Sequence, residues 1–428
     1  MQIASPCLAG FAMTMAYKNS DKSLRFLLPV AFDNRGMKTK IPYLVLLPFF
    51  IACTSAAPPT AMPRVVEVLP TQTPVQVATP EPQPVATGWK VESVAEGLTV
   101  PWSIVFTSAD RILLTERGGT IREIVGGNLN PEPLMVFEDV SARSESGLMG
   151  LAVDPQYDVN RYLYACYTYA GSNGAANRVV RLKDEGDSVV LDTIILDPLP
   201  SANNHAGCRI RFGPDGKLYI TNGDALEPSS AQDLTSLAGK ILRINPDGSI
   251  PEDNPFRGSP VWSYGHRNPQ GIDWQPGSGR MYSTEHGPSG FDGPQGGDEI
   301  NLIQAGGNYG WPLVSHDEQR EGTFAPVIQF TPAEAPASLS FYASDVLPMF
   351  TESLFFGALR GEGLVSIMLS DSDPNEVISV EKIISDIGRV RDVVQGPDGF
   401  IYFSTSNRDG RGRAREGDDH IYRIVPVY

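Results

Sequence analysis

The sequence predicts an all-β fold, a six-bladed β-propeller of four-stranded blades. From Trp89 to Tyr428, short runs of alternating apolar and polar residues recur between turns of Gly, Pro and Asp, and no run has the 3.6-residue period of an amphipathic helix. Four of the turns carry a proline between two strand-like runs. These prolines are 59, 62 and 121 residues apart, the last interval being two periods. Such spacing is typical of repeat architectures, propellers among them.

Each expected blade can be placed in chain order. The first covers residues 101–124, the fifth covers residues 340–367, and the other four contain the turn prolines Pro155, Pro214, Pro276 and Pro397. Six repeats of about 57 residues leave room for four strands and long loops in each blade. A pair of β-sandwiches or a seven-bladed ring would need a repeat that the sequence does not contain.

Composition narrows the class of ligand. The chain has 428 residues, of which 41% are hydrophobic, so any disorder is expected to be local. Its formal net charge is −16. This charge argues against a nucleic-acid partner, which would need a basic surface, and favours a small or cationic ligand.

The N-terminal segment reads as an export signal. Residues 1–52 are expected to be a leader that ends in a signal peptide, with Met37 as the true start, because two lysines precede an apolar run too short to span a bilayer. This run ends in "FIAC", which resembles the lipobox of bacterial lipoproteins. We therefore expect an extracytoplasmic protein of the bacterial cell envelope, lipid-anchored to the membrane at Cys53. An uncleaved hydrophobic leader is the alternative.

A spacer is expected between this anchor and the propeller. Residues 53–88 are rich in Pro and Thr, which favours an extended tether over a folded domain. The propeller domain is expected to span residues 89–428.

Polar residues recur at equivalent places in the repeat. In a propeller blade, the residues before the first strand and after the second strand lie at the same mouth of the central channel. Those before a first strand are Glu145, His205, Arg267 with Asn268, and Arg389 with Arg391. Those after a second strand are Asp224, Glu285 to Pro288, Arg360 and Asn407. We expect these side chains to line one mouth.

This set of residues has a definite chemistry. His205 is suited to take a proton near neutral pH, with Asp224 to orient its ring. The arginines favour a planar anion. The Gly- and Pro-rich segment 287–312, with its carboxylates, offers the oxygen ligands that Ca²⁺ takes, although such segments are also common as plain turns.

Two cysteines lie in strand-like runs of the propeller. Cys166 and Cys208 are expected to be buried free thiols, and a disulfide between them is the alternative. A zinc site is not expected, because no second Cys or His lies at ligand spacing.

Four motifs in order resemble one family. "HAGCRIRFGPDGKLYITNGD", "GHRNPQG", "GPQGGDEINLIQAGGNYGWP" and "GRVRDVVQGPDG" resemble the quinoprotein glucose/sorbosone dehydrogenases, most closely the aldose sugar dehydrogenase branch. The resemblance implies a six-bladed propeller that binds pyrroloquinoline quinone (PQQ) with Ca²⁺. It also implies oxidation of an aldose at its anomeric carbon to the lactone, by hydride transfer to the quinone.

The resemblance also assigns roles to residues. It implies that His205 is the general base, Asp224 its partner, and Arg267 the group that polarises the quinone. The implied cofactor contacts are Asn268, Arg360, Arg389, Arg391 and Glu145; Arg360 stands where Lys is common and Glu145 where Gln is common. The implied Ca²⁺ ligands are the Gly287 and Pro288 carbonyls for the cofactor ion, and Glu299 and Tyr309 for a structural ion.

Two other classes of function remain open from the sequence. A Ca²⁺-dependent propeller lactonase would not need an arginine clamp for a planar cofactor. A non-catalytic binding propeller would tolerate replacement of His205 and Arg267. The sequence names neither the sugar nor the electron acceptor.

Overall fold

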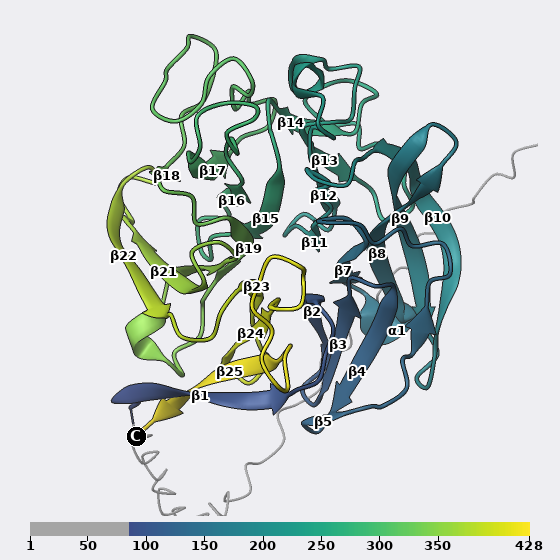
Figure 1. Cartoon of the computed structure of the whole chain (residues 1–428), viewed down its shortest axis with the longest axis vertical. Helices are drawn as coiled ribbons and strands as arrows, with labels where there is room; N and C mark the ends of the chain where they lie inside the picture. The colour runs from purple at the N-terminus through teal and green to yellow at the C-terminus, as the bar shows by residue number, and fades with distance from the viewer. Residues whose placement is uncertain (1–84) are drawn as a thin grey trace, which may run out of the picture. The chain divides into compact units, whose positions relative to one another are not determined.

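The computed structural model describes residues 85–428, which form six antiparallel sheets in a ring. Figure 1 looks along the axis of this ring, and the strands follow one another around it from the purple N-terminal part to the yellow C-terminal part. The six-bladed propeller predicted from the repeat is therefore confirmed, and the sandwich and seven-bladed alternatives are excluded. The leader, the Cys53 anchor and most of the expected spacer lie outside the described residues.

The blades follow the predicted order, and their strands have the following bounds. Blade 1 contains β2 (Pro101–Ser108), β3 (Arg111–Glu116), β4 (Thr120–Val125) and the short edge strands β5 (Asn128–Leu129) and β6 (Met135–Val136). Blade 2 contains β7 (Leu148–Val153), β8 (Tyr162–Gly171), β9 (Gly174–Asp184) and β10 (Val189–Pro200), with a single-turn helix α1 (Tyr157–Asn160) between its first two strands. Blade 3 contains β11 (Ile210–Phe212), β12 (Leu218–Asn222), β13 (Lys240–Ile244) and β14 (Val261–Tyr264), and a 3₁₀ turn, η1 (Pro228–Gln232), precedes β13.

The remaining three blades have the same plan. Blade 4 contains β15 (Pro269–Trp274), β16 (Met281–Glu285), β17 (Asp298–Ile303) and β18 (Ile328–Phe330). Blade 5 contains β19 (Pro336–Phe341), β20 (Leu354–Ala358), β21 (Gly363–Leu369) and β22 (Val377–Ile384), with the 3₁₀ turn η2 (Pro348–Phe350) before β20. Blade 6 contains β23 (Val390–Gln395), β24 (Ile401–Thr405), β25 (Ile421–Val427) and β1 (Gly88–Ala95).

The ring is closed by its two ends. Strand β1 pairs antiparallel with β25, so the first strand of the fold is the outer strand of the last blade. Figure 1 shows β1 beside β25 at the lower edge of the ring. This pairing joins the two ends of the domain by main-chain hydrogen bonds, which is how a propeller leaves only short, protected sheet edges.

The hydrophobic core lies between neighbouring blades. One buried cluster joins blades 2 and 3 and contains Met149, Tyr164, Ile220 and Leu242. The other interfaces are filled in the same way, because the two faces of each sheet are covered by the adjacent blades. Within residues 85–428, none of the helices has the length and apolar character needed to cross a membrane.

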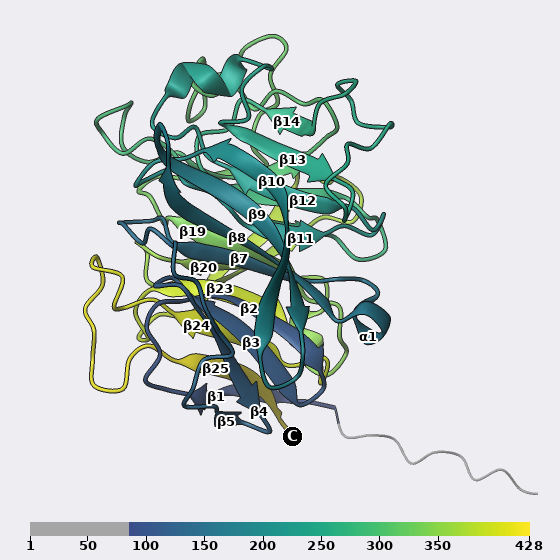
Figure 2. The ribbon, with the colours of Figure 1, turned by 90° about the vertical axis from the view of Figure 1, so that its right-hand side faces the viewer.

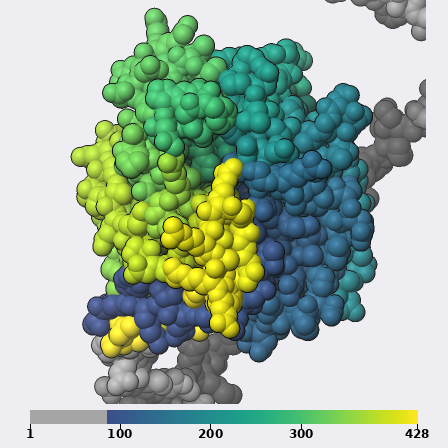
Figure 3. Space-filling view, in the orientation of Figure 1, coloured from purple at the N-terminus to yellow at the C-terminus, as the bar shows by residue number. Residues whose placement is uncertain are grey.

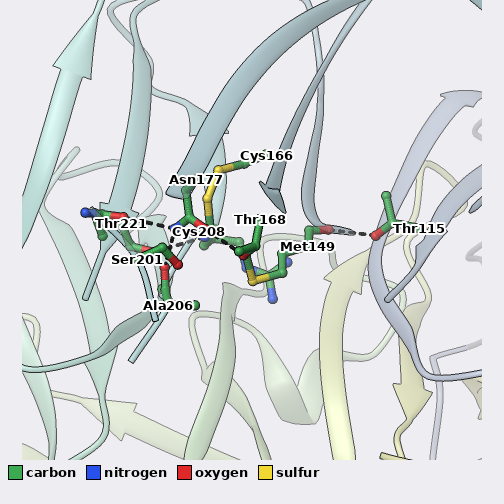
Figure 4. The surroundings of a disulfide bond; sticks show 12 residues. Thr115, Met149, Cys166, Thr168, Asn177, Ser201, Ala206, Cys208 and Thr221 are labelled. Carbon is green, nitrogen blue, oxygen red and sulfur yellow. Dashed lines mark hydrogen bonds between the residues drawn. A yellow bond between two sulfur atoms is a disulfide. The ribbon is translucent and has the colours of Figure 1, made fainter. Parts of the chain in front are cut away.

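The cysteine prediction was wrong. Cys166 on β8 and Cys208, just before β11, form a disulfide, with their Cα atoms 5.8 Å apart (Figure 4). Both residues are completely buried between blades 2 and 3. The sequence did not predict the pairing because the contact depends on how two adjacent blades pack, and the cysteines are 42 residues apart.

Candidate active site at the mouth of the channel

A polar cavity of about 300 Å³ lies where all six blades converge. In the space-filling view of this face, the yellow C-terminal segment lies across its middle (Figure 3). Part of that segment is the loop between β24 and β25, which stands out from the sheets in Figure 2. Six arginines and three carboxylates line the cavity, together with two histidines: Arg117, Arg267, Arg360, Arg389, Arg391, Arg411, Glu145, Asp298, Asp409, His205 and His286. A protein of net negative charge therefore has a cationic cavity.

Most of the predicted site residues meet in this cavity. Its walls include Glu145, His205, Arg267, Asn268, Gly287, Pro288, Arg360, Arg389 and Arg391. Asp224 lies behind His205 and is fully buried. Glu299 and Tyr309 line a smaller adjoining cavity that shares Gly287 and Pro288 with the first.

The loop before β11 holds His205 rigidly. The Nδ1 atom of His205 lies 2.7 Å from Oδ1 of Asp224, whose other oxygen accepts from the Trp311 indole N–H at 2.8 Å. An ionised carboxylate only accepts hydrogen bonds, so Nδ1 carries the proton and Nε2 is left as the acceptor. Gly223 permits this packing, because a Cβ there would lie 2.0 Å from the His205 carbonyl oxygen. The arrangement is that of an imidazole held for proton transfer.

A buried polar network also holds the loop that carries His205. Asn177 on β9 donates to the Ala206 carbonyl at 2.8 Å and to Asn222 Oδ1 at 3.1 Å, and Thr168 donates to Asn177 at 2.6 Å. Figure 4 shows this network beside the disulfide. The loop that carries His205 is thus tied to blade 2 both covalently and by hydrogen bonds.

Arg267 is held by the turn that follows β16. Its Nε donates to Asp292 at 2.7 Å, its Nη1 to the His286 carbonyl at 3.1 Å, and its Nη2 to the Ser289 hydroxyl at 3.2 Å. Its side chain is almost fully buried. The guanidinium therefore has a fixed orientation at the wall of the cavity.

Arg389 and Arg391 supply positive charge from blade 6. Arg389 donates to Asp409 at 2.8 Å and to the Leu359 carbonyl at 2.6 Å. The Nε of Arg391 is buried and has no hydrogen-bond partner among the described residues. Burial, together with the positive charges of Arg389 and Arg117, lowers the pKa of Arg391 to about 9 despite the attraction of Asp409. A bound anion would accept a hydrogen bond from the Arg391 Nε and would offset the excess positive charge.

Glu145 remains ionised inside this cationic site. Its carboxylate accepts from the His205 backbone N–H and from Asn268, both at 3.0 Å, and from Arg411 at 3.1 Å. Burial alone would raise the pKa of Glu145, but the charges of His286 and Arg411 outweigh it and lower the pKa to about 2. The carboxylate that stands where the resemblance implies an amide is thus offset by Arg411.

The smaller adjoining cavity is rich in oxygen. Glu299 is half-buried, and loss of solvent contact together with the nearby Glu285 raises its pKa to about 8. Two buried side-chain oxygens on the same sheet, Asn301 Oδ1 and Gln329 Oε1, have no donor among residues 85–428, and Gln329 lies opposite Glu299 in the register. Within residues 85–428 no group of three or more His, Cys, Asp or Glu side chains is arranged to hold a metal. Any cation here would therefore need amide and main-chain oxygens as well.

Sequence reasoning missed three charged residues of the cavity wall. Arg117 follows β3, while Asp409 and Arg411 belong to the loop between β24 and β25. Arg117 follows the second strand of its blade. The same position identified Asp224 and Arg360 in other blades, so the repeat could have predicted Arg117 as well. Asp409 and Arg411 follow Asn407 by a few residues, and no repeat-equivalent position marks them.

The fold and the site define a class: a six-bladed propeller with a buried His–Asp pair and an arginine-lined cavity suited to an anionic ligand at one mouth of its channel. The family model for glucose/sorbosone dehydrogenases matches residues 98–422. The chain belongs to this family of sugar-oxidising oxidoreductases.

Named relatives agree with this assignment. The chain is 34% identical to the aldose sugar dehydrogenase YliI of Escherichia coli over 345 residues, which cover 75% of this chain and 91% of that protein. The PQQ-bound aldose sugar dehydrogenase of Streptomyces coelicolor is 33% identical and superposes with a TM-score of 0.70, over 79% of this chain and 98% of that one. The apo form of the soluble aldose sugar dehydrogenase of Escherichia coli is 32% identical, with a TM-score of 0.69 over 79% of this chain and all of that one.

Proposed function

We propose that this chain is a PQQ-dependent dehydrogenase that oxidises an aldose at its anomeric carbon to the lactone. The observation that carries the proposal is the arginine-lined cavity beside the His205–Asp224 pair, where the buried Nε of Arg391 lacks a partner within residues 85–428. A planar tricarboxylate fits this excess of guanidinium groups. When bound, PQQ accepts the hydride from the anomeric carbon.

The residues of the chain divide the remaining work. Arg389, Arg391 and Arg360 would bind carboxylates of the cofactor, and Arg267 would stabilise the negative charge that reduction creates. Asn268 and Glu145 complete the polar wall. The Nε2 atom of His205 accepts the proton of the anomeric hydroxyl, and Asp224 stabilises the resulting imidazolium.

Calcium is part of the proposal. The carbonyls of Gly287 and Pro288, which border both cavities, are suited to an ion beside the cofactor. Glu299, with the amide oxygens of Asn301 and Gln329 that lack a donor in the described part of the chain, is suited to a second, structural ion. The Tyr309 hydroxyl is engaged by Leu302 and Gln304, so its contribution would come from its main-chain carbonyl.

We also propose that the protein works in the bacterial cell envelope, anchored at Cys53. The disulfide between Cys166 and Cys208 supports an oxidising compartment, because such bonds are rare in the cytosol. The anchor itself rests on the lipobox-like "FIAC" of the leader.

A dye-reduction screen across aldoses, with and without added PQQ and Ca²⁺, tests the activity. We expect reduction of the dye only when PQQ, Ca²⁺ and a suitable aldose are all present. Lactone hydrolysis without PQQ would instead support the Ca²⁺-dependent hydrolase. Retention of all binding after replacement of His205 and Arg267 would support a non-catalytic module.

A further inference from the structure

An exposed phenylalanine stands at the rim of the cavity beside the proposed base. The side chain of Phe291 is 71% exposed, and its ring lies 6.1 Å from the His205 imidazole, centroid to centroid, at an interplanar angle of 23°. Two other aromatic side chains of the described residues are also exposed, Phe324 and Tyr428. Phe324 stacks on Tyr309 and Tyr428 is the C-terminal residue, so neither lies against His205.

The loop that carries Phe291 is fixed rather than loose. Asp292 accepts from Arg267 at 2.7 Å and from the Ser289 backbone N–H at 2.9 Å, and Ser289 accepts from Arg267 at 3.2 Å. Gly290 has a φ of 94°, which allows the tight turn before Phe291. The same arginine that lines the cavity therefore positions the aromatic ring at its rim.

The position of the Phe291 ring favours a role in substrate binding. Isolated exposed apolar residues are common and need no explanation by themselves. On the His205 side, however, the cavity wall consists of polar side chains: Glu145, Asn268 and Gln270. An aldopyranose has polar hydroxyl edges and C–H groups on its faces, so it needs apolar surface next to such a wall. Phe291 supplies that surface within reach of the base.

We propose that Phe291 determines substrate specificity by packing against the C–H face of the aldose ring while His205 engages the anomeric hydroxyl. This inference rests on the proposed function, because it takes an aldose as the substrate. It selects pyranoses whose stacked face carries no axial hydroxyl, since such a hydroxyl would be pressed against the ring without a partner.

The test compares three variants of the PQQ- and Ca²⁺-loaded enzyme: Phe291→Ala, Phe291→Tyr and the control Ile378→Ala. Ile378 is an exposed apolar residue on β22, an outer strand. We expect Phe291→Ala to raise KM for the best aldose roughly tenfold, the effect of losing one aromatic contact. Turnover and PQQ affinity should change little, whereas Phe291→Tyr and Ile378→Ala should stay within about twofold of wild type.

A second readout separates recognition from a structural role. The ratio of kcat/KM between two aldoses that differ by one axial hydroxyl should shrink in Phe291→Ala and persist in Phe291→Tyr. An unchanged KM and ratio in Phe291→Ala, or an equal rise of KM in Ile378→Ala, overturns the inference. Failure of the proposed function would be seen separately, as a wild-type protein that neither binds PQQ nor oxidises any aldose, and that result overturns both.

Discussion

The imidazole of His205 and the carboxylate of Asp224 form a buried hydrogen-bonded pair, with 2.7 Å between Nδ1 and Oδ1. Asp224 also accepts from the Leu226 backbone N–H at 2.9 Å and from the Trp311 indole at 2.8 Å. Because the carboxylate is held by three donors, it fixes both the tautomer and the orientation of the ring. His205 also lines the cavity, so the pair presents a proton acceptor to whatever occupies it.

Replacement of Arg267 should affect both binding and turnover. In Arg267→Ala the cavity loses a fixed guanidinium that would bind an anionic cofactor and would stabilise the further negative charge created by reduction. We expect weaker PQQ occupancy together with a lower kcat, measured by quinone absorbance and by dye reduction. Arg181→Ala, which removes a surface arginine paired with Asp192 on an outer strand, is the matched control and should leave both unchanged. Equal PQQ affinity in Arg267→Ala and wild type would contradict this role.

Removal of Ca²⁺ should lower both activity and thermal stability. An ion that binds only the folded state stabilises it by about 2.7 kcal/mol at a hundredfold excess over Kd. Calorimetry in excess chelator and in excess Ca²⁺ measures the difference. Glu299→Gln should reduce the Ca²⁺-dependent rise in Tm, since it removes the charged oxygen of the proposed structural site. Identical melting in chelator and Ca²⁺ would rule that site out.

Glu145 should make stability depend on pH in the acid range. Its folded-state pKa of about 2 lies below the ordinary value near 4.5, so the unfolded chain binds more protons between these values. The contribution of the ionised Glu145 to the free energy of unfolding is complete above pH 4.5 and is lost as the pH falls towards 2. The unfolding free energy of wild type minus that of Glu145→Gln should therefore fall by on the order of 2 kcal/mol between pH 6 and pH 3. A difference that does not vary with pH would contradict the assignment.

The lipid anchor can be tested on the native protein. If the chain is cleaved before Cys53 and acylated there, its intact mass reports a lipidated cysteine as the first residue. Each buried CH₂ of the acyl chains contributes about 0.8 kcal/mol to membrane binding, so several chains hold the protein firmly. Cys53→Ala should then move the protein to the soluble fraction. An unmodified N-terminus at another residue would disprove the anchor.

The repeat period explains how much could be predicted. Residues such as Glu145, His205 and Arg267 are about sixty residues apart, the length of one blade, so equal spacing in sequence becomes convergence at one mouth. The strands themselves were visible as alternating runs, as in the hairpin of β11 and β12. Because the blades form a ring, residues at equivalent positions of the repeat meet in one cavity.

Contacts that depend on packing between blades could not be predicted in this way. Arg411 reaches Glu145 although 266 residues separate them, and β1 pairs with β25 across the whole domain. The disulfide was wrongly predicted as two free thiols for the same reason. The proposed role of Phe291 could not be predicted from the sequence either, because it depends on the position of its ring beside the His205 imidazole.

Single-turnover reduction of bound PQQ by an aldose, followed by absorbance in wild type and in His205→Ala, tests the central claim most directly. Both proteins should bind PQQ, because His205 is not part of the proposed clamp, which consists of Arg267, Arg360, Arg389, Arg391 and the Gly287 and Pro288 carbonyls. The wild type should be reduced rapidly. His205→Ala should be slower by roughly 10² to 10⁴, the contribution of a positioned base. Reduction of His205→Ala at nearly the wild-type rate would contradict the account and leave His205 without a catalytic role.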